Sequence, residues 1–202
     1  MATSKESSTP SGDRRVRRTR SALARALIQL VEQQDLSRIS VSDVAEGAGV
    51  SRSAFYDHYR DVHELAEDAC TAMIDGLIES LPTLGLDPAD LEREAIQSLA
   101  AFFASLAEHA GLYRALLGAQ GSARVVDHIR RRMAAVIHDH LEAGDAREHV
   151  PYDVTAAFIA GALIGVAVDW LQGGCDRSPA EMATVTWPLL DAHYRVHEAG
   201  RS

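Results

Sequence analysis

The sequence predicts an all-α fold of about nine helices, with a small N-terminal helical domain and a larger C-terminal one. Apolar residues recur every three to four positions along most of the 202 residues, which is the period of an amphipathic helix. Several helix starts carry a capping residue. The strict apolar–polar alternation that is typical of a half-buried strand occurs nowhere, and the chain contains no internal repeat.

The composition is that of an ordinary globular chain. Hydrophobic residues make up 47% of it and charged residues 24%, which argues against extended disorder. The longest apolar run, Ala156–Val168, is too short to cross a membrane, since a spanning helix needs about 20 residues. The polar N-terminus lacks the apolar core of a secretory signal. Two isolated cysteines, Cys70 and Cys175, form neither a disulfide framework nor a zinc pattern, so we expect a cytoplasmic protein.

The net charge of −9 is distributed unevenly along the chain. Residues 1–60 carry ten basic and seven acidic side chains, whereas the remainder carries ten basic and 22 acidic ones. Within residues 13–25, six arginines stand against one aspartate. A basic front end on an acidic body is expected when one end of a protein binds a polyanion, although a solvated, charge-rich terminus has the same pattern.

The first long helix is predicted over residues 14–34. Residues 1–13 are rich in Ser, Thr, Gly and Pro, and we expect a disordered tail there. A short connection over residues 35–40 follows the helix, with Leu36 and Ile39 as expected core anchors. The apolar face of the helix consists of Val16, Leu23, Leu27, Leu30 and Val31.

Two short helices joined by a turn come next. Ser40 opens the first of them, and Asp43 completes a capping box with it. Gly49 suits the left-handed conformation that ends a helix, and Ser51 then caps a helix over residues 52–59. Two short helices with a glycine-containing turn, packed on a longer helix, form the helix-turn-helix arrangement.

The remaining helices form a second domain. We expect the helix-turn-helix domain to cover residues 14–61 and a C-terminal domain to cover 62–202, with a helix over 62–81 linking the two. Breaks rich in Pro, Gly or Asp separate the later helices, which are expected at residues 89–108, 111–117, 122–143, 152–172 and 178–198. Pro188 is expected to kink the last of them.

One segment resembles a known family. Val41–Asp61 reads VSDVAEGAGVSRSAFYDHYRD, with a small residue before the turn glycine, then Val-Ser-Arg, a Phe-Tyr pair and a second aromatic residue. This is similar to the DNA-binding signature of the TetR (tetracycline repressor-like) family, over about residues 15–73. The resemblance implies a repressor that leaves a palindromic operator when a small, largely apolar effector binds. Val62 departs from the pattern, because the family usually has a lysine there that supports a backbone contact.

The start of the helix at 52–59 is expected to meet DNA. A recognition helix enters the major groove with its N-terminal residues toward the base edges. Arg52 can fork onto guanine O6 and N7, Ser53 can donate or accept, and the Ala54 methyl can touch a thymine methyl. Phe55 and Tyr59 are expected to face the core. The expected DNA contacts are Arg17, Arg18, Ser40, Ser42, Ser51, Arg52, Ser53, Ala54, Tyr56 and His58.

The C-terminal helices are expected to form a dimer. A dimer places two recognition helices one duplex turn apart, about 34–36 Å. Small residues at four-residue spacing in the helix at 152–172 allow another helix to approach closely, and the resemblance implies a four-helix interface with the helix at 178–198. Packing within one subunit is the alternative. The expected interface residues are Ala157, Gly161, Gly165, Trp170, Leu189 and Tyr194.

Apolar residues of the middle helices either line an effector cavity, as the resemblance implies, or pack as plain core. The candidate cavity residues are Phe102, Phe103, Leu106, Tyr113, Met133, Ile137 and Phe158. Asp169, on an otherwise apolar helix, is a polar contact for a ligand or a partner subunit, or else a solvated side chain.

Motifs for catalysis and for cofactor binding are absent from the sequence. It contains no Gly-rich phosphate loop, nucleophile elbow or dinucleotide fingerprint. Its nine histidines include His138 and His140, which flank Asp139, and His193 and His197 at i and i+4. The sequence has no His-Glu-x-x-His or paired-cysteine motif, so these histidines are interpreted as surface or interface residues. We expect no enzymatic activity, cofactor or metal. The expected partners are double-stranded DNA, a small effector and a second copy of the chain, and an effector-independent DNA-binding or interaction protein is the alternative.

Overall fold

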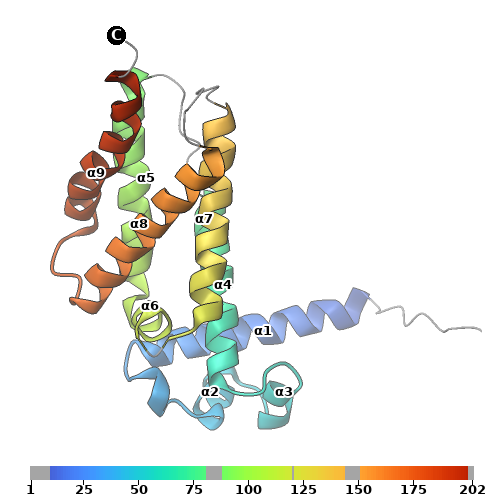
Figure 1. The fold of residues 1–202 in the computed structure, drawn as a ribbon. Helices are drawn as coiled ribbons and strands as arrows, with labels where there is room; N and C mark the ends of the chain where they lie inside the picture. Colours follow the sequence, from blue (N-terminus) through green and yellow to red (C-terminus); the bar gives the residue numbers. More distant parts are fainter. Residues whose placement is uncertain (1–9, 81–87, 120, 144–150, 200–202) are drawn as a thin grey trace, which may run out of the picture. The chain divides into compact units, whose positions relative to one another are not determined.

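The computed structural model describes residues 10–80, 88–119, 121–143 and 151–199. Within these ranges the chain folds into nine α-helices and one 3-10 turn, and none of these residues lies in a β-strand (Figure 1). The all-α prediction is therefore confirmed. Two compact units divide inside helix α4, between Ala69 and Cys70, whereas the sequence-based boundary assigned all of this helix to the second domain.

The first unit contains the predicted helix-turn-helix. It consists of α1 (Pro10–Val31), a 3-10 turn (Leu36–Arg38), α2 (Val41–Ala48), α3 (Arg52–Tyr56) and the first part of α4 (Val62–Ser80). Its buried apolar side chains include Leu23, Leu27, Ile39, Val44, Phe55 and Leu65. Helix α1 packs on α2, and α2 packs on α3, so the long first helix supports the two short ones as expected.

Helix α1 begins earlier than the composition of the N-terminus predicts. Residues 10–13 are helical, so the expected disordered tail was wrong for them, and residues 1–9 lie outside the described residues. Proline suits the first position of a helix, because it has no N–H to leave unpaired and its φ is already helical. Asp13 then lies in the first turn and pairs with Arg17 one turn later, at 3.4 Å.

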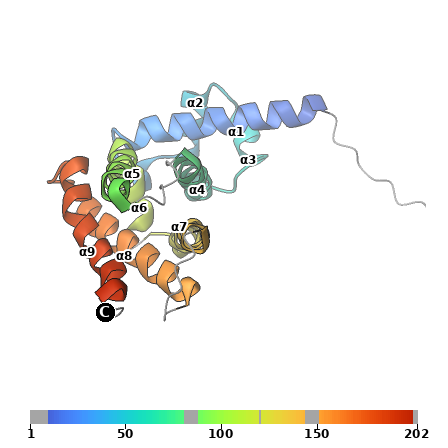
Figure 2. The same ribbon diagram turned by 90° about the horizontal axis from the view of Figure 1, so that it is seen from above.

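The second unit consists of the rest of α4 and five further helices. These are α5 (Pro88–Glu108), α6 (Ala110–Leu117), α7 (Ala123–Ala143), α8 (Tyr152–Gln172) and α9 (Pro179–Ala199). Helix α9 packs along α5 and α7 packs along α8, and α8 crosses obliquely between these neighbours (Figures 1 and 2). All five match helices that the sequence predicts, and α9 continues past Pro188.

Aromatic side chains join α5 and α8 in the core of the second unit. The ring of Phe103 meets the rings of Phe102 and Trp170 edge-on, at centroid distances of 5.4 and 5.3 Å. The Trp170 indole Nε1 also donates to the carbonyl of Arg177 at 3.0 Å, which holds the connection between α8 and α9 against this core. Edge-to-face pairs of this kind add stabilisation beyond the area that the rings bury.

A charged cluster ties α4 to α7 within the second unit. His128 Nε2 lies 3.0 Å from Asp75 Oδ1, and Arg132 Nε donates to the same oxygen at 2.8 Å. Burial raises the pKa of the Asp75 carboxyl, but its contacts with His128 and Arg132 outweigh burial and hold that pKa below its usual value. The carboxylate is therefore ionised at neutral pH and bridges the two helices.

Helix α8 is the most apolar helix of the described chain. It is long and apolar enough to cross a membrane, but half of its most apolar window is buried inside the protein. Core helices of globular proteins have this composition, so the helix is weak support for membrane insertion. Its buried face consists of Thr155, Ala156, Ile159, Ala160, Leu163, Ala167, Trp170 and Leu171.

The turn after α2 depends on one glycine. Gly49 has φ 66° and ψ 33°, which is the left-handed conformation predicted for the end of this helix. The Gly49 N–H donates to the backbone carbonyls of Ala45 and Glu46, and the Val50 N–H donates to the Ala45 carbonyl at 2.9 Å. A side chain at Gly49 would be strained even though no atom occupies the space around it.

We expect Gly49→Ala to lower the free energy of unfolding by about 1 kcal/mol, because alanine is disfavoured at positive φ. The matched control is Gly76→Ala, in the C-terminal part of α4, where an added Cβ also meets no atom within 4 Å. There alanine should raise stability by up to about 1 kcal/mol, since it is the better helix former. Urea unfolding of both full-length variants measures the difference. If both substitutions change the free energy of unfolding by the same amount, the turn after α2 does not depend on the left-handed conformation of Gly49.

Candidate nucleic-acid interface

The start of α2 is closed by a complete capping box. The Ser40 hydroxyl accepts from the Asp43 N–H at 3.2 Å and donates to the Asp43 carboxylate at 2.8 Å, and the Ser40 N–H donates to the same carboxylate at 2.8 Å. These bonds lower the pKa of Asp43, so the carboxylate is charged at neutral pH. The hydroxyl of Ser40 is already used by its own helix, whereas the nearby Ser42 is exposed.

The start of α3 is capped as predicted. The Ser51 hydroxyl accepts from the Ala54 N–H at 3.1 Å, while the Ser51 backbone is extended. Helix α3 ends at Tyr56, so it is shorter than the predicted helix over 52–59. The capped end is the end that a recognition helix directs toward bases.

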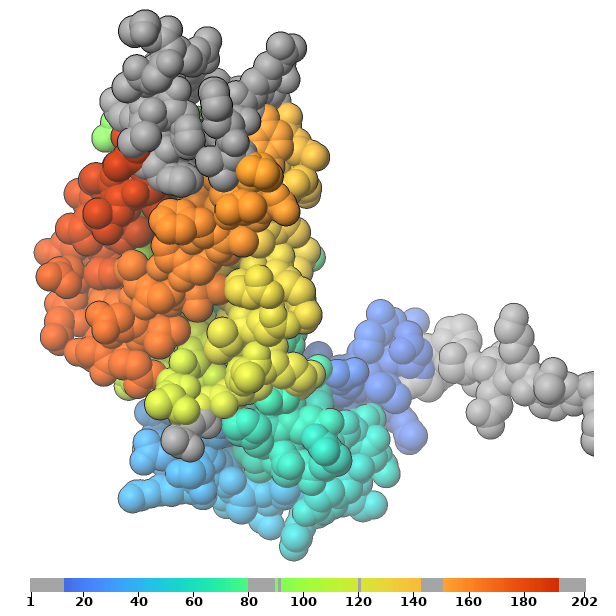
Figure 3. All heavy atoms as spheres, in the orientation of Figure 1, coloured from blue at the N-terminus to red at the C-terminus, as the bar shows by residue number. Residues whose placement is uncertain are grey.

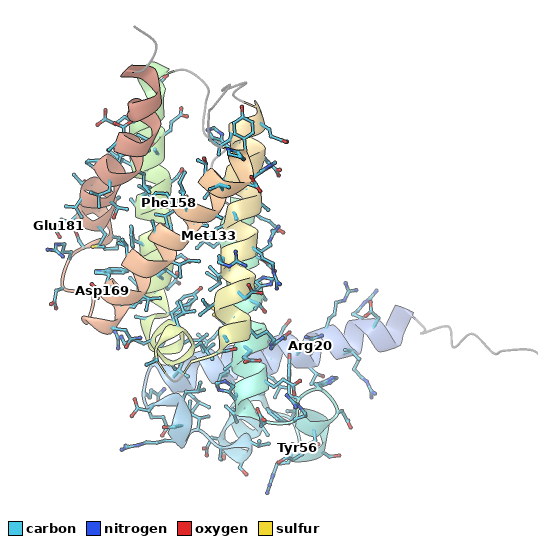
Figure 4. All side chains as sticks on the ribbon, viewed as in Figure 1. Arg20, Tyr56, Met133, Phe158, Asp169 and Glu181 are labelled. Atoms are coloured by element: carbon cyan, nitrogen blue, oxygen red, sulfur yellow. The ribbon has the colours of Figure 1, made fainter. Side chains whose placement is uncertain are left out.

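The two faces of α3 differ sharply. Phe55 is fully buried, whereas Arg52 and Ser53 are exposed and Ala54 is partly exposed. Tyr56 is 54% exposed and projects outward from the helix (Figure 4). The side chains predicted to read base edges therefore share the open side of α3. His58, which follows the helix, is partly buried, and its ring lies edge-on to that of Tyr59 at 6.5 Å.

A hydrogen-bonded network lies behind the end of α3. Tyr59 is 4% exposed, and its hydroxyl donates to Asp68 Oδ2 at 2.7 Å and accepts from Arg20 Nε at 3.0 Å. Arg20 Nη2 donates to both carboxylate oxygens of Asp68, each at 2.8 Å. Burial and the bond to Asp68 raise the pKa of Tyr59 to about 12, so the hydroxyl keeps its proton at neutral pH. The sequence had grouped Arg20 with the basic stretch and gave no signal of this network.

The other arginines of α1 form the basic part of the unit. Arg18 is exposed, and Arg17 is exposed but pairs with Asp13. An exposed pair of this kind is weak, so Arg17 can exchange its partner for a phosphate at little cost. The exposed arginines of α1 also include Arg14, Arg15 and Arg25.

The start of α4 explains the departure at Val62. The Glu64 N–H donates to Asp61 Oδ1 at 2.8 Å, and the Glu64 carboxylate accepts from the N–H of Arg60 at 2.7 Å. These bonds cap the helix, although the second one reaches one residue further back than in a standard capping box. Val62 is 9% exposed, so this position packs into the core instead of extending a cation outward.

The candidate cavity residues divide into a buried group and one exception. Buried are Phe102, Phe103, Leu106, Tyr113 and Met133, and Ile137 is partly buried. Phe158 is 56% exposed, so its assignment to an internal cavity was wrong (Figure 4). Phe158 lies on the face of α8 opposite the core. Both faces of this helix are largely apolar, so helical periodicity alone could not show which face is buried.

Three buried polar atoms near α5 and α6 make no hydrogen bond among the described residues. They are Ser98 Oγ, His109 Nδ1 and Tyr113 Oη. Tyr113 is completely buried, and burial raises the pKa of its hydroxyl above the usual value. Buried polar groups are nearly always paired, so each such atom requires an explanation.

The expected interface residues fall mostly on one exposed face of α8 and α9. Ala157, Gly161 and Gly165 are exposed on α8, and Leu189 is 69% exposed on α9. Trp170 is buried against Phe103, so its place is mainly in the core of its own unit and the expectation for it was wrong. The side chain of Tyr194 lies outside the described residues.

Helices α8 and α9 are exposed next to each other on one face of the second unit (Figure 3). A groove of about 460 Å³ lies between them. It is lined by Gly165, Val166, Asp169, Trp170, Arg177, Met182, Val185, Thr186 and Leu189. Asp169 is exposed beside this groove, so its polar group faces outward and not into the core.

One group of side chains in the described chain has the spacing of metal ligands. The ligand atoms of His138, Asp139 and Glu142 lie within 4.8 Å of one another. All three come from one helix, and the two carboxylates are exposed. A structural zinc site instead draws four ligands into a closed, hydrogen-bonded shell.

Comparisons with known proteins agree with this architecture. Residues 23–69 match the model of the family "Bacterial regulatory proteins, tetR family", and residues 93–190 match that of "Transcriptional regulator C-terminal region". The first match covers the two short helices together with Tyr59 and Asp68, while Arg20 lies just before it. The second covers most of the second unit.

Two curated relatives are transcriptional regulators. The uncharacterized HTH-type transcriptional regulator YxbF of Bacillus subtilis is 26% identical over 191 residues, which cover 91% of this chain and 48% of the relative. The HTH-type transcriptional regulator EthR of Mycobacterium tuberculosis is 32% identical over 108 residues, which cover 52% of this chain and 48% of EthR. The chain thus spans about half the length of the curated relatives it matches.

Solved structures share the fold at lower identity. A tetR-family transcriptional regulator from Streptomyces coelicolor superimposes with a TM-score of 0.70 at 21% identity, over 91% of this chain and 83% of that one. The regulator FadR from Bacillus subtilis, solved in complex with stearoyl-CoA, gives 0.63 at 12% identity, over 84% and 96%. The matched families and relatives are transcriptional regulators, a class without enzymatic activity. The chain belongs to the TetR family of bacterial transcriptional regulators.

Proposed function

We propose that this protein is a dimeric repressor that binds a palindromic operator and leaves it when a small, largely apolar effector binds. The division of α3 into a buried and an exposed face carries the proposal. Phe55 anchors the helix, and Arg52 and Ser53 are then exposed at its capped N-terminal end. Side chains of these types at that end of a helix suit base edges in the major groove.

Charge supports contact with the DNA backbone. The exposed arginines of α1 belong to the same unit as α3, while most of the negative charge lies beyond residue 60. Arginine contacts to phosphate position a protein on the duplex and make its affinity depend on salt. Asp43 and Asp57 place negative charge in this unit, so we propose that the arginines of α1 supply a large share of the backbone contacts.

The outward face of α8 supports a dimer. Between the polar residues Asp153 and Gln172 at its two ends, the exposed residues of α8 are Val154, Ala157, Phe158, Gly161, Gly165 and Asp169, which recur at helical spacing. A Cβ added at Gly161 or Gly165 meets no atom within 4 Å, so packing inside one subunit does not require glycine there. Exposed Val185 and Leu189 extend the apolar surface onto α9. A contiguous apolar surface of this kind marks an interaction site, and we assign it to the second subunit.

The unpaired atoms in the second unit support an effector site. Tyr113 Oη and Ser98 Oγ are buried and have no hydrogen-bond partner in the part of the chain that the structure describes. An effector with an apolar body and a hydroxyl or carbonyl group would satisfy such an atom. The FadR regulator was solved in complex with stearoyl-CoA, so a protein that shares this fold binds a ligand with a long apolar chain.

Release follows from a two-state equilibrium in this proposal. An effector that binds one arrangement of the dimer more tightly shifts the population toward it. If the recognition helices of that arrangement no longer match successive major grooves, operator affinity falls by the same coupling factor. Helix α4 is the proposed transmitter, because it continues from the first unit into the second. We expect the protein to act in the cytoplasm.

Selection of bound sequences from random duplexes tests the central assignment. We expect a palindrome, and Arg52→Ala should lower affinity for it by about tenfold or more and relax the preference at one base of each half-site. Arg38→Ala, in the 3-10 turn, is the control for loss of one exposed positive charge. If the full chain selects no sequence, or if Arg52→Ala leaves the preference unchanged, the regulator assignment is wrong.

We expect Gly161→Leu to shift the protein toward the monomer. In a single subunit an added Cβ at exposed Gly161 meets no atom within 4 Å, and leucine is the better helix former, so a loss of assembly must come from the blocked approach of a partner. Ala135→Leu adds bulk at an exposed position of α7 and serves as the control. Sedimentation velocity of both variants measures the change. A Gly161→Leu protein that stays dimeric would place the interface elsewhere.

Tyr113→Phe removes a buried hydroxyl that has no hydrogen-bond partner among the described residues. The free energy of unfolding should therefore stay level or rise by about 1 kcal/mol, in contrast to the loss that is usual when a buried hydrogen bond is deleted. The same variant should bind a polar-headed effector more weakly in a thermal-shift screen. A large destabilisation would show that the hydroxyl is satisfied within the protein and does not mark a ligand site.

A further inference from the structure

Helix α3 has too few residues to hold its own orientation. It spans Arg52–Tyr56, and isolated helices of this length are unstable in water. The direction of α3 must therefore come from a cap at its first end and from contacts with other segments in its middle and beyond its second end. Ser51 caps the first end, Phe55 is fully buried in the middle, and the chain just beyond the second end is held at Tyr59.

Tyr59 is held by two other segments of the same unit. Asp68 of α4 accepts from its hydroxyl at 2.7 Å, and Arg20 of α1 donates to the hydroxyl at 3.0 Å. The Arg20 guanidinium also lies 5.6 Å from the centre of the Tyr59 ring. The ring itself packs against Phe55, at a centroid distance of 5.9 Å. One tyrosine thus joins α1, α4 and the anchor of α3.

Arg20 differs from Arg17 and Arg18 in bonding to side chains of other segments, Tyr59 and Asp68. Its Nε is used by Tyr59, and its Nη2 lies 2.8 Å from each oxygen of Asp68. The charge of the guanidinium is neutralised by that carboxylate. Arg18, two residues earlier, is exposed and belongs to the basic surface.

We infer that Arg20, Tyr59 and Asp68 act together as positioning residues for the DNA-reading helix, and that Arg20 is not a phosphate contact. This inference rests on the function proposed above. Arg20 and Asp68 hold the Tyr59 hydroxyl in place, and Tyr59 sets the angle at which α3 leaves the turn. Because side chains at the N-terminal end of α3 must reach base edges, a small change in this angle weakens sequence-specific contacts first.

The energetics separate this role from a purely stabilising one. The side chains of Arg20 and Asp68 are 47% and 39% exposed, and an exposed ion pair adds little to the stability of a fold. Removal of the network should therefore leave the protein folded. Affinity for the selected sequence should fall, and affinity for unrelated duplexes, which depends on phosphate contacts, should stay the same.

The test uses the full chain with Arg20→Gln and Tyr59→Phe, and with Arg18→Gln as the matched loss of one arginine. Tyr59→Phe removes only the hydroxyl and keeps the ring in the core. Affinity is measured at several salt concentrations for the selected duplex and for a scrambled duplex of equal length. We expect Arg20→Gln and Tyr59→Phe each to lower specific affinity about tenfold, with no change in the salt dependence, and the double variant to lose no more than either one.

Arg18→Gln should behave differently. It should weaken binding to both duplexes by similar factors and reduce the slope of log affinity against log salt by about one. If Arg20→Gln also reduces that slope, or if Tyr59→Phe leaves specific affinity intact, the positioning role is wrong. Thermal unfolding of each variant confirms that it is folded under the conditions used.

Amide hydrogen exchange without DNA separates this inference from the proposed function. Arg20→Gln and Tyr59→Phe should speed the exchange of amides in residues 52–59, while those of α2 change little. Faster exchange in a protein that selects no sequence would retain the positioning network and remove the regulator assignment. Unchanged exchange, together with normal sequence selection, would remove the network's role and leave the regulator intact.

Discussion

The burial of Phe55 is the constraint on which the proposed DNA-reading surface depends. A helix turns 100° per residue, so once Phe55 is fixed in the core, the sides on which its neighbours lie are fixed too. Arg52, Ser53 and Tyr56 are then exposed. The left-handed turn at Gly49 sets where this helix begins, and the Ser51 cap satisfies its first amides. Local chemistry starts the helix, and a single buried ring orients it.

The second unit shows how one helix can be apolar on two sides for two reasons. One side of α8 packs on α5, α6 and α7, through residues such as Ile159 and Trp170. The other side consists largely of small and apolar residues that stay exposed, such as Gly161 and Phe158. A surface helix normally has a polar outer face. On α8 the middle of the exposed face has one charged residue, Asp169, among small and apolar ones. This is the physical reason for assigning the face to a second subunit, since exposure of so many apolar groups to water is unfavourable.

Residues of the same type can have different environments, even within one helix. Arg18 and Arg20 are two positions apart on α1, yet only Arg20 bonds to Tyr59 and Asp68. Phe103 is fully buried on α5, whereas Phe158 is 56% exposed on α8. In each pair the amino acid and the local pattern are alike. What differs is the element that packs alongside, and that element is distant in sequence.

The sequence by itself determined the order of the helices and the capped starts of α2 and α3, because caps follow from interactions within a few residues. The Ser40–Asp43 box, the Ser51 cap and the glycine turn were predicted and found, as were the buried Phe55 and Tyr59. Tertiary structure decided the rest. It placed Trp170 in the core and Phe158 at the surface, and it brought Arg20, Tyr59 and Asp68 together across up to 48 positions of chain. Contacts over such separations depend on how whole helices pack, and the 3.6-residue period carries no record of that packing.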